Sequence, residues 1–211
     1  MTRRGLSRDR LVDIAHEFVS AHGLDALTMR RLATAAEVTS GALYKHVRDR
    51  RDLQRAMADA IFGAVDIADV DLGNPTADQV VHCCERMRHA MLGFRDGGRI
   101  VAGSYSPSAA TLRVSGTLLS LLEAVTLPQY DAGEIALVLR SYTTGFVIEE
   151  QAYLELVQAD EWEPLVRSIS SNGHGRTDKT SDLIALMTSD RGKRFTSGLA
   201  SILTGPVLPA T

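Results

Sequence analysis

Apolar residues recur every three or four positions along most of the chain, which is the spacing of one face of an α-helix. No segment shows a convincing alternation of apolar and polar residues, the pattern expected of a half-buried strand. The first apolar stripe consists of Leu11, Ile14, Ala15, Phe18 and Val19. It ends at Gly23, a residue suited to the left-handed backbone that closes many helices. The sequence therefore predicts an all-α protein that begins with an amphipathic helix.

Three shorter helices are predicted to follow before residue 66. Thr28 can cap the first of them, a second is expected at about 40–47, and Asp49 can cap the third. The buried face of the helix after Thr28 is predicted to contain Leu32, Ala33 and Ala36. The apolar face of the helix after Asp49 is predicted to contain Leu53, Met57, Ala60, Ile61 and Ala64.

The later part of the chain is predicted to contain longer helices. Residues 66–75 are rich in acidic residues and contain a glycine and a proline, so we expect a loop there. Beyond this loop, helices are predicted at about 77–94, 99–103, 108–126, 131–158 and 191–204. The stretch 159–181 contains a run of serine, asparagine and glycine residues and is predicted to be a flexible loop.

Composition bounds the class of protein. Hydrophobic residues make up 45% of the chain, enough for a normal globular core, so intrinsic disorder is excluded as a description of the whole. Cys83 and Cys84 are adjacent and fit neither a disulfide framework nor a paired zinc motif, so we expect a reducing compartment. The first residues are basic, but no apolar stretch follows them, so neither a signal peptide nor a membrane span is expected. These features predict a cytoplasmic protein.

The net charge of −3 is unevenly distributed. Residues 1–55 carry 11 Lys and Arg against 7 Asp and Glu, whereas the remaining 156 residues carry 12 against 19. Attraction to phosphate groups depends on local rather than total charge. Such an asymmetry can arise by chance, but it is also what a chain would show if only its first part met nucleic acid.

Residues 28–47 fit the two short helices and tight turn of a helix-turn-helix motif. The side chains of Thr39-Ser40-Gly41-Ala42 are small, so base edges could approach this end of the second helix closely, and its hydroxyl and amide groups could bind phosphates. Leu43 and Val47 are predicted to anchor that helix on its neighbours. The residues left facing outward are Tyr44, Lys45 and His46. The flanking cations, which would contact phosphates, are Arg30, Arg48, Arg50 and Arg51.

The segments Leu27-Thr28-Met29-Arg30-Arg31-Leu32-Ala33 and Val38-Thr39-Ser40-Gly41-Ala42-Leu43-Tyr44-Lys45-His46-Val47 resemble the DNA-binding part of TetR-family repressors. The resemblance covers about residues 8–65. It implies base contacts by Arg30, Thr39, Ser40, Ala42 and Lys45, and contacts to the DNA backbone by Tyr44, His46 and Arg50. Gly41 belongs to the same surface and stands where tetracycline repressors usually have proline. Taken alone, Tyr44 could pack between helices and His46 could cap a helix end.

The rest of the chain resembles the tetracycline-repressor branch through Arg95-Asp96-Gly97, Gly103-Ser104 with Pro107, and Thr144-Gly145-Phe146-Val147-Ile148-Glu149-Glu150-Gln151. This resemblance implies a drug-sized cavity. The ligand-binding residues that it implies are Cys83, Met87, Val101, Ser104, Leu118, Ser141 and Glu149. The polar groups that this branch uses for a magnesium–tetracycline complex are replaced here at Cys83, Val101, Leu118 and Ser141. We therefore expect a more apolar or different inducer, and no metal or other cofactor.

A single DNA-reading segment makes too few contacts for useful specificity, so we expect a homodimer on two half-sites of double-stranded operator DNA. The interface candidates are the helix at 131–158 and the final helix, with Phe195, Leu199, Ile202 and Leu203; intramolecular core is the alternative for both. The predicted function is a transcriptional repressor, not an enzyme, that a small-molecule inducer releases. Its parts are predicted to be a DNA-binding domain at 1–49, a linking helix at 50–66, and a ligand-binding and dimerisation domain at 67–205.

Other interpretations start from His82, Glu85 and His89, which lie at i, i+3 and i+7 of one helix. They could bind zinc or another transition metal, although a solvated polar face explains them better. A small helical enzyme centred on His82, Cys83 and Glu85 is a second hypothesis, but no nucleophile motif, phosphate loop or complete metal set accompanies these residues. A third is a protein-interaction adaptor that does not bind DNA. Steep salt dependence of DNA binding would distinguish a repressor from both.

Overall fold

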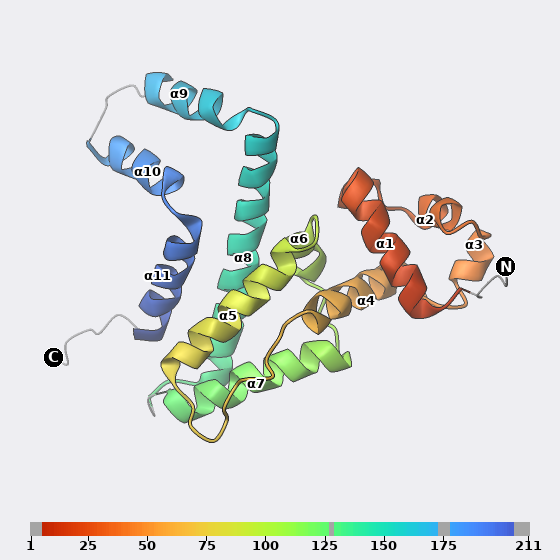
Figure 1. Cartoon of the computed structure of the whole chain (residues 1–211), viewed down its shortest axis with the longest axis horizontal. Helices are drawn as coiled ribbons and strands as arrows, with labels where there is room; N and C mark the ends of the chain where they lie inside the picture. Colours follow the sequence, from red (N-terminus) through yellow and green to blue (C-terminus); the bar gives the residue numbers. More distant parts are fainter. Residues whose placement is uncertain (1–5, 127–128, 173–177, 205–211) are drawn as a thin grey trace. The chain divides into compact units, whose positions relative to one another are not determined.

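The computed structural model describes residues 6–126, 129–172 and 178–204, and its regular structure is helical, with no strand among these residues (Figure 1). The helices are α1 (Arg8–His22), η1 (Leu24–Ala26), α2 (Met29–Ala35), α3 (Ser40–Leu43), α4 (Arg50–Gly63), α5 (Ala77–Leu92), α6 (Gly97–Val101), α7 (Ala109–Val125), α8 (Ala132–Gln158), α9 (Trp162–Asn172), α10 (Asp178–Thr188) and α11 (Arg191–Thr204). The predicted all-α class is confirmed. No helix in the described ranges is long and apolar enough to cross a membrane.

The chain divides into two compact units, Met1–Ile148 and Glu149–Thr211, and the division falls within α8. The first unit contains α1 to α7 and the first part of α8. The second contains the end of α8 and α9 to α11. Within the first unit we call residues 8–49, which contain α1 to α3, the head, and α5 to α7 the body helices.

Side-chain caps fix where the first helices begin. The side chains of Ser7, Thr28 and Asp49 each accept a hydrogen bond from a backbone N–H in the first turn of α1, α2 and α4. The predicted caps Thr28 and Asp49 are therefore confirmed. At the end of α1, Gly23 has a φ of 79°, a backbone conformation that side chains disfavour. The buried apolar residues of the head are Leu11, Val12, Ala15, Val19, Leu24, Leu27, Leu32, Ala33, Leu43 and Val47.

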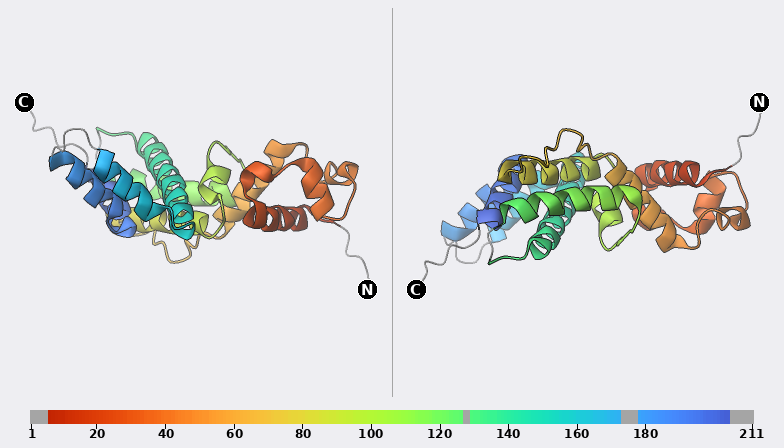
Figure 2. Two further views of the ribbon diagram at one scale, coloured as in Figure 1. Left: turned by 90° about the horizontal axis from the view of Figure 1, so that it is seen from above. Right: turned by 90° about the horizontal axis from the view of Figure 1, so that it is seen from below.

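Helix α4 lies between the head and the body helices, as both views in Figure 2 show. It contacts α1, α5, α6 and α7. Its buried apolar residues are Leu53, Met57, Ala58, Ile61 and Phe62. Ala60 and Ala64, which the sequence places on the buried face, are exposed. That part of the prediction is wrong because it assumed a single buried stripe, whereas α4 packs against partners on more than one side.

The turn from α5 into α6 is closely packed. Asp96 has a φ of 58°, and a Cβ built on the next residue, Gly97, would overlap the backbone oxygen of Met91. A Cβ on Gly98 would lie 2.9 Å from the side chain of Ile148 on α8. These close contacts hold α6 against both α5 and α8. Helix α6 starts at Gly97, two residues before the predicted position.

The two cysteines lie on α5 and are buried and free, which confirms them as small core residues. Burial raises the pKa of Cys83 to about 11 and that of Cys84 to about 12. Both thiols are consequently uncharged at neutral pH.

In the second unit, the predicted flexible loop at 159–181 is wrong for most of its length, because it contains all of α9 and the start of α10. The overlooked pattern is Trp162, Leu165, Val166 and Ile169, spaced i, i+3, i+4 and i+7. The serine-rich run that suggested a loop lies partly within α9. Residues 173–177 of the predicted loop lie outside the described residues.

The second unit also contains an aromatic and cationic cluster. Tyr153 and Trp162 meet edge to face with ring centroids 4.7 Å apart, and the guanidinium carbon of Arg191 lies 3.1 Å from the centre of the Tyr153 ring. Phe195 and Leu199 on α11 are both 0% exposed. They are already buried within the single chain, so these two residues belong to its core and not to a subunit interface.

Candidate functional site

The segment at residues 39–46 presents polar side chains outward over an apolar base. Leu43 and Val47 are 0% and 2% exposed, which confirms both as anchors, whereas Tyr44 is 53% exposed. The α-helix itself is shorter than predicted, since α3 ends at Leu43. The following turn is tightened by bonds between residues three apart, such as the backbone N–H of His46 donating to the carbonyl of Leu43 at 2.9 Å.

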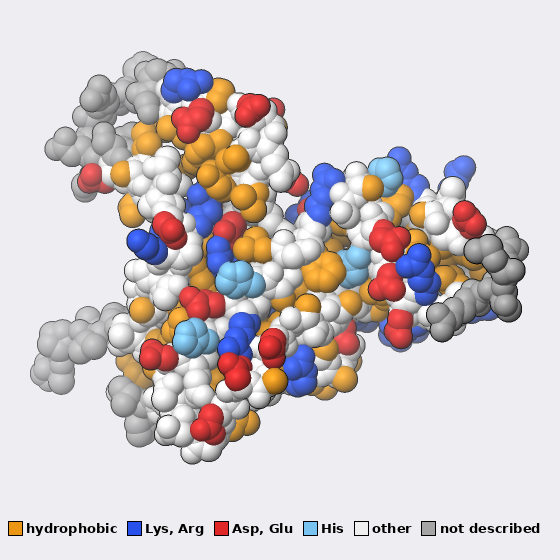
Figure 3. All heavy atoms as spheres, viewed as in Figure 1, with side chains coloured by type: hydrophobic (Ala, Val, Ile, Leu, Met, Phe, Trp, Pro, Cys, Tyr) orange, Lys and Arg blue, Asp and Glu red, His pale blue; other side chains and the backbone are white. Residues whose placement is uncertain are grey.

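All nine residues predicted to contact DNA lie at least partly in solvent. The exposed ones are Arg30, Thr39, Ser40, Gly41, Tyr44, Lys45 and Arg50, and the half-buried ones are Ala42 and His46. A Cβ built on Gly41 would meet only the hydroxyl of Thr39, at 4.0 Å. Within the described part of the chain, no close contact requires glycine at this position. Figure 3 shows Lys and Arg side chains on the visible face of the head, interspersed with acidic ones.

Asp52 on α4 holds the C-terminal end of this segment, and this role was not predicted from the sequence. Its side chain is 13% exposed, and its carboxylate accepts hydrogen bonds from the Arg8 guanidinium at 3.0 Å and from the backbone N–H of Arg48 at 2.9 Å. Arg8 also donates to the carbonyl oxygen of His46 at 2.6 Å. The Arg8 hydrogen bond, aided by the Arg48 N–H, lowers the pKa of Asp52 to about 2. A carboxylate three residues after the Asp49 cap was the available signal.

A second carboxylate joins the head to the body helices. The Oδ2 atom of Asp96 accepts a buried hydrogen bond from the backbone N–H of Leu24 at 2.8 Å. Its Oδ1 atom accepts from Arg99 at 2.8 Å, and Arg99 also pairs with Asp25 at 2.6 Å. This network ties η1 to the turn before α6.

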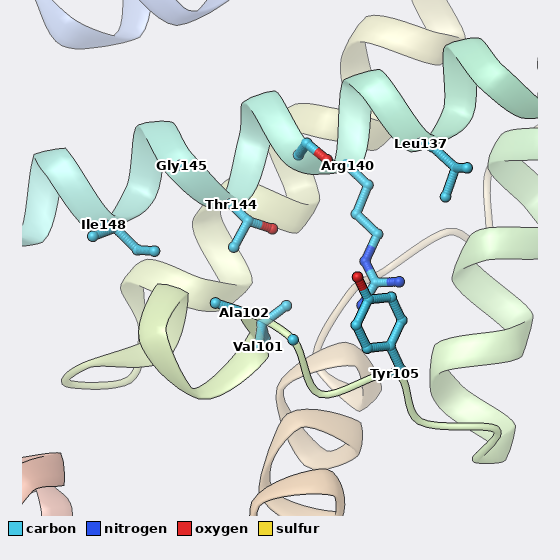
Figure 4. Close-up of a pocket in the computed structure, with 10 residues that line it drawn as sticks. Val101, Ala102, Tyr105, Leu137, Arg140, Thr144, Gly145 and Ile148 are labelled. Carbon is cyan, nitrogen blue, oxygen red and sulfur yellow. The ribbon is translucent and has the colours of Figure 1, made fainter.

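A cavity of about 310 Å³ lies between α6, the loop after it and α8 (Figure 4). The residues that line it are Val101, Ala102, Gly103, Tyr105, Leu137, Arg140, Ser141, Thr144, Gly145 and Ile148. Its size is within the range of small-molecule sites. The wall is mainly apolar, carries several hydroxyl groups, and has Arg140 as the one charged residue among the ten.

Two of the ligand-binding residues implied by resemblance, Val101 and Ser141, line this cavity. Three others are buried in the core: Cys83, Met87 and Leu118. Ser104 lies between two lining residues, and its hydroxyl is buried without a hydrogen-bond partner among the described residues. Glu149 is exposed and belongs to the second unit.

The remaining residues of the wall were not predicted from the sequence. Arg140, Thr144 and Ile148 recur every four residues and so share one face of α8. That periodicity was the available signal. It could not show which element the face meets, because α6 lies about 40 residues earlier in the chain.

The cavity does not fit a magnesium complex, because none of its ten lining residues carries an imidazole or a carboxylate. On α5, His82 and His89 are exposed. Across the part of the chain that the structure describes, no three His, Cys, Asp or Glu side chains are grouped so that they could hold a metal ion.

Comparison with protein families gives two matches. The family described as "Bacterial regulatory proteins, tetR family" matches residues 11–57, and "Tetracyclin repressor-like, C-terminal domain" matches residues 73–206. Among curated proteins, the tetracycline repressor protein class A from transposon 1721 of Escherichia coli is 31% identical over 152 residues, which cover 70% of this chain and 68% of that protein.

Solved structures agree with these matches. A possible TetR family transcriptional regulator from Streptomyces coelicolor A3(2) has a TM-score of 0.80 and 30% identity, over 94% of this chain and 98% of that one. The Streptomyces coelicolor TetR family protein ActR, in complex with (S)-DNPA, has a TM-score of 0.76 and 26% identity, over 95% and 96%. The chain therefore belongs to the TetR family of bacterial regulatory proteins and carries a tetracycline-repressor-like C-terminal domain.

Proposed function

We propose that this TetR-family regulator is a homodimeric repressor that a small molecule releases from operator DNA. Because the chain belongs to a family of transcriptional regulators, we favour a repressor over a small helical enzyme or an interaction adaptor. We assign DNA binding to residues 1–49, linkage to 50–66, and ligand binding with dimerisation to 67–205. Because a DNA-binding regulator works beside the chromosome, we assign the protein to the bacterial cytoplasm.

The observation that carries this proposal is the exposed edge of residues 39–45 above the buried anchors Leu43 and Val47. Such an edge can enter a major groove without unfolding the head. We assign base contacts to Arg30, Thr39, Ser40, Gly41, Ala42 and Lys45, and contacts to the DNA backbone to Tyr44, His46 and Arg50. The phosphate contacts would position the head, and the base contacts would select the operator.

Helix α4 is the candidate link between ligand and DNA. Arg50 is its first residue, and one turn later the side-chain amide of Gln54 donates to the carbonyl oxygen of Ile100 on α6 at 3.2 Å. The next residue, Val101, lines the cavity. A ligand that displaces α6 would therefore move α4 and the DNA-facing segment with it. Weakening DNA binding 100-fold requires the ligand to prefer the released state by about 2.7 kcal/mol.

Exposed apolar side chains in the second unit support a dimer. Leu154, Val157, Leu165 and Leu186 are 40% to 58% exposed. Figure 3 shows hydrophobic side chains gathered over α9, α10 and the adjoining end of α8. Since soluble chains rarely leave such patches uncovered, we assign this surface to contact with a second copy.

The test is selection of binding sites from a random pool of DNA duplexes, followed by titration of the selected duplex at several salt concentrations. We expect two half-sites separated by about 34–36 Å. Affinity should fall steeply as salt rises, and Lys45→Ala should reduce that slope by about one. Tyr44→Ala should also weaken binding, whereas the control Lys193→Ala, an exposed lysine on α11, should not. No selected site, or unchanged affinity in both head variants, would contradict the proposal.

A further inference from the structure

We propose that the cavity between α6 and α8 binds a planar aromatic anion, a molecule with a carboxylate or phenolate group on fused rings. This inference rests on the proposed function and specifies the chemical class of its inducer. The first observation is the charge of the wall, in which Arg140 is cationic and none of the other nine residues is acidic. Among the described residues no carboxylate pairs with Arg140, so a bound anion would be its counterion.

The geometry of Arg140 suits a flat anion. Figure 4 shows its side chain extending from α8 toward Tyr105, and the guanidinium carbon lies 5.7 Å from the centre of the Tyr105 ring. A guanidinium group held against a ring keeps its N–H edges free for a carboxylate. Arg140 is half-buried, so its bond to an anion would be partly shielded from water.

The rest of the wall is mainly apolar and carries no charge. In Figure 4 the side chains of Thr144 and Ile148 face Val101 and Ala102. Gly145 lies inside α8, yet a Cβ there would meet nothing within 4 Å. Glycine within a helix costs about 1 kcal/mol relative to alanine, and no packing against the described residues requires it here. Its presence keeps the wall flat where a ring would lie.

The experiment compares three matched probes: 2-naphthoate, 2-naphthamide and 2-naphthylmethylammonium. Each is titrated calorimetrically into the full-length protein. We expect the acid to bind at least about tenfold more tightly than the amide, because a charge-assisted bond to Arg140 is available only to the acid. The ammonium probe should bind most weakly. Arg140→Gln should remove the difference between acid and amide, and Arg140→Lys should keep part of it.

Two further variants complete the design. Gly145→Leu should abolish binding of the acid, because its side chain would fill the space beside the wall. Arg10→Gln removes an exposed cation on α1 that pairs with Glu17 and lies outside the cavity wall, so it should keep the preference for the acid. Equal binding of acid and amide, no binding of the acid, or a preference that survives Arg140→Gln would overturn the inference. If duplex binding is normal in that case, only the inducer class is wrong; if the protein binds no duplex, the proposed function has failed.

Discussion

Replacing Asp52 with asparagine should destabilise the protein and weaken DNA binding together. The carboxylate is largely buried, and its pKa is lowered from 3.8 to about 2 by the Arg8 hydrogen bond first and the Arg48 N–H second. A shift of this size corresponds to about 2 kcal/mol of folding free energy. Asparagine can still accept from the Arg48 N–H, but it cannot pair with Arg8. Arg8 in turn holds the carbonyl oxygen of His46, so the DNA-facing turn should loosen.

The pH dependence provides the sharper measurement. Because the folded pKa of Asp52 lies below the unfolded one, its contribution is complete above about pH 4 and is lost as the pH falls toward 2. Urea denaturation should therefore show Asp52→Asn less stable by about 2 kcal/mol at pH 7, with a much smaller difference near pH 2. The control Glu17→Gln breaks an exposed ion pair and should cost less than about 1 kcal/mol. A difference below about 0.5 kcal/mol at pH 7, or one that is equal at both pH values, would refute this reasoning.

Three more predictions follow from local packing. Gly41→Leu should leave the melting temperature nearly unchanged but reduce affinity for the selected duplex at least about tenfold in a fluorescence titration, because its open surroundings accept a side chain that DNA would not. Gly97→Ala should lower the free energy of unfolding by about 2 kcal/mol or more, because the added Cβ would overlap the backbone of Met91. The control Gly116→Ala on α7 has nothing within 4 Å and should raise the free energy of unfolding by up to about 1 kcal/mol. Equal effects of the two variants in urea denaturation would contradict the packing argument. Cys83 and Cys84, with pKa values raised to about 11 and 12, should remain unmodified by iodoacetamide at pH 8 until urea is added, as mass spectrometry would show.

Features set by neighbouring residues were predictable from the sequence. The caps at Thr28 and Asp49 were predicted because a capping residue needs only the helix turn that follows it. The anchors Leu43 and Val47 were predicted for the same reason, since four-residue spacing defines their shared face. The loop expected at 159–181 shows the limit, because composition was given more weight than the apolar spacing within α9.

Features set by distant partners were not predictable. The buried sides of α4 depend on which helices surround it, so Ala60 was misplaced and Phe62 was overlooked. The cavity wall depends on how α6 packs against α8. Family resemblance identified Val101 and Ser141, but Arg140 and Tyr105 became evident only from the three-dimensional packing.

The buried hydrogen bond from the backbone of Leu24 to Asp96 limits how such regulators can be recombined. A chimera that grafts a foreign reading module onto this ligand-sensing scaffold must also supply an amide where Leu24 now donates. Without that match, the buried Asp96 carboxylate or the amide opposite it would lack a hydrogen-bond partner, at a cost of about 1–3 kcal/mol. Biosensor builders should therefore transplant the turn around Asp96 together with the module, rather than cutting at the linker alone.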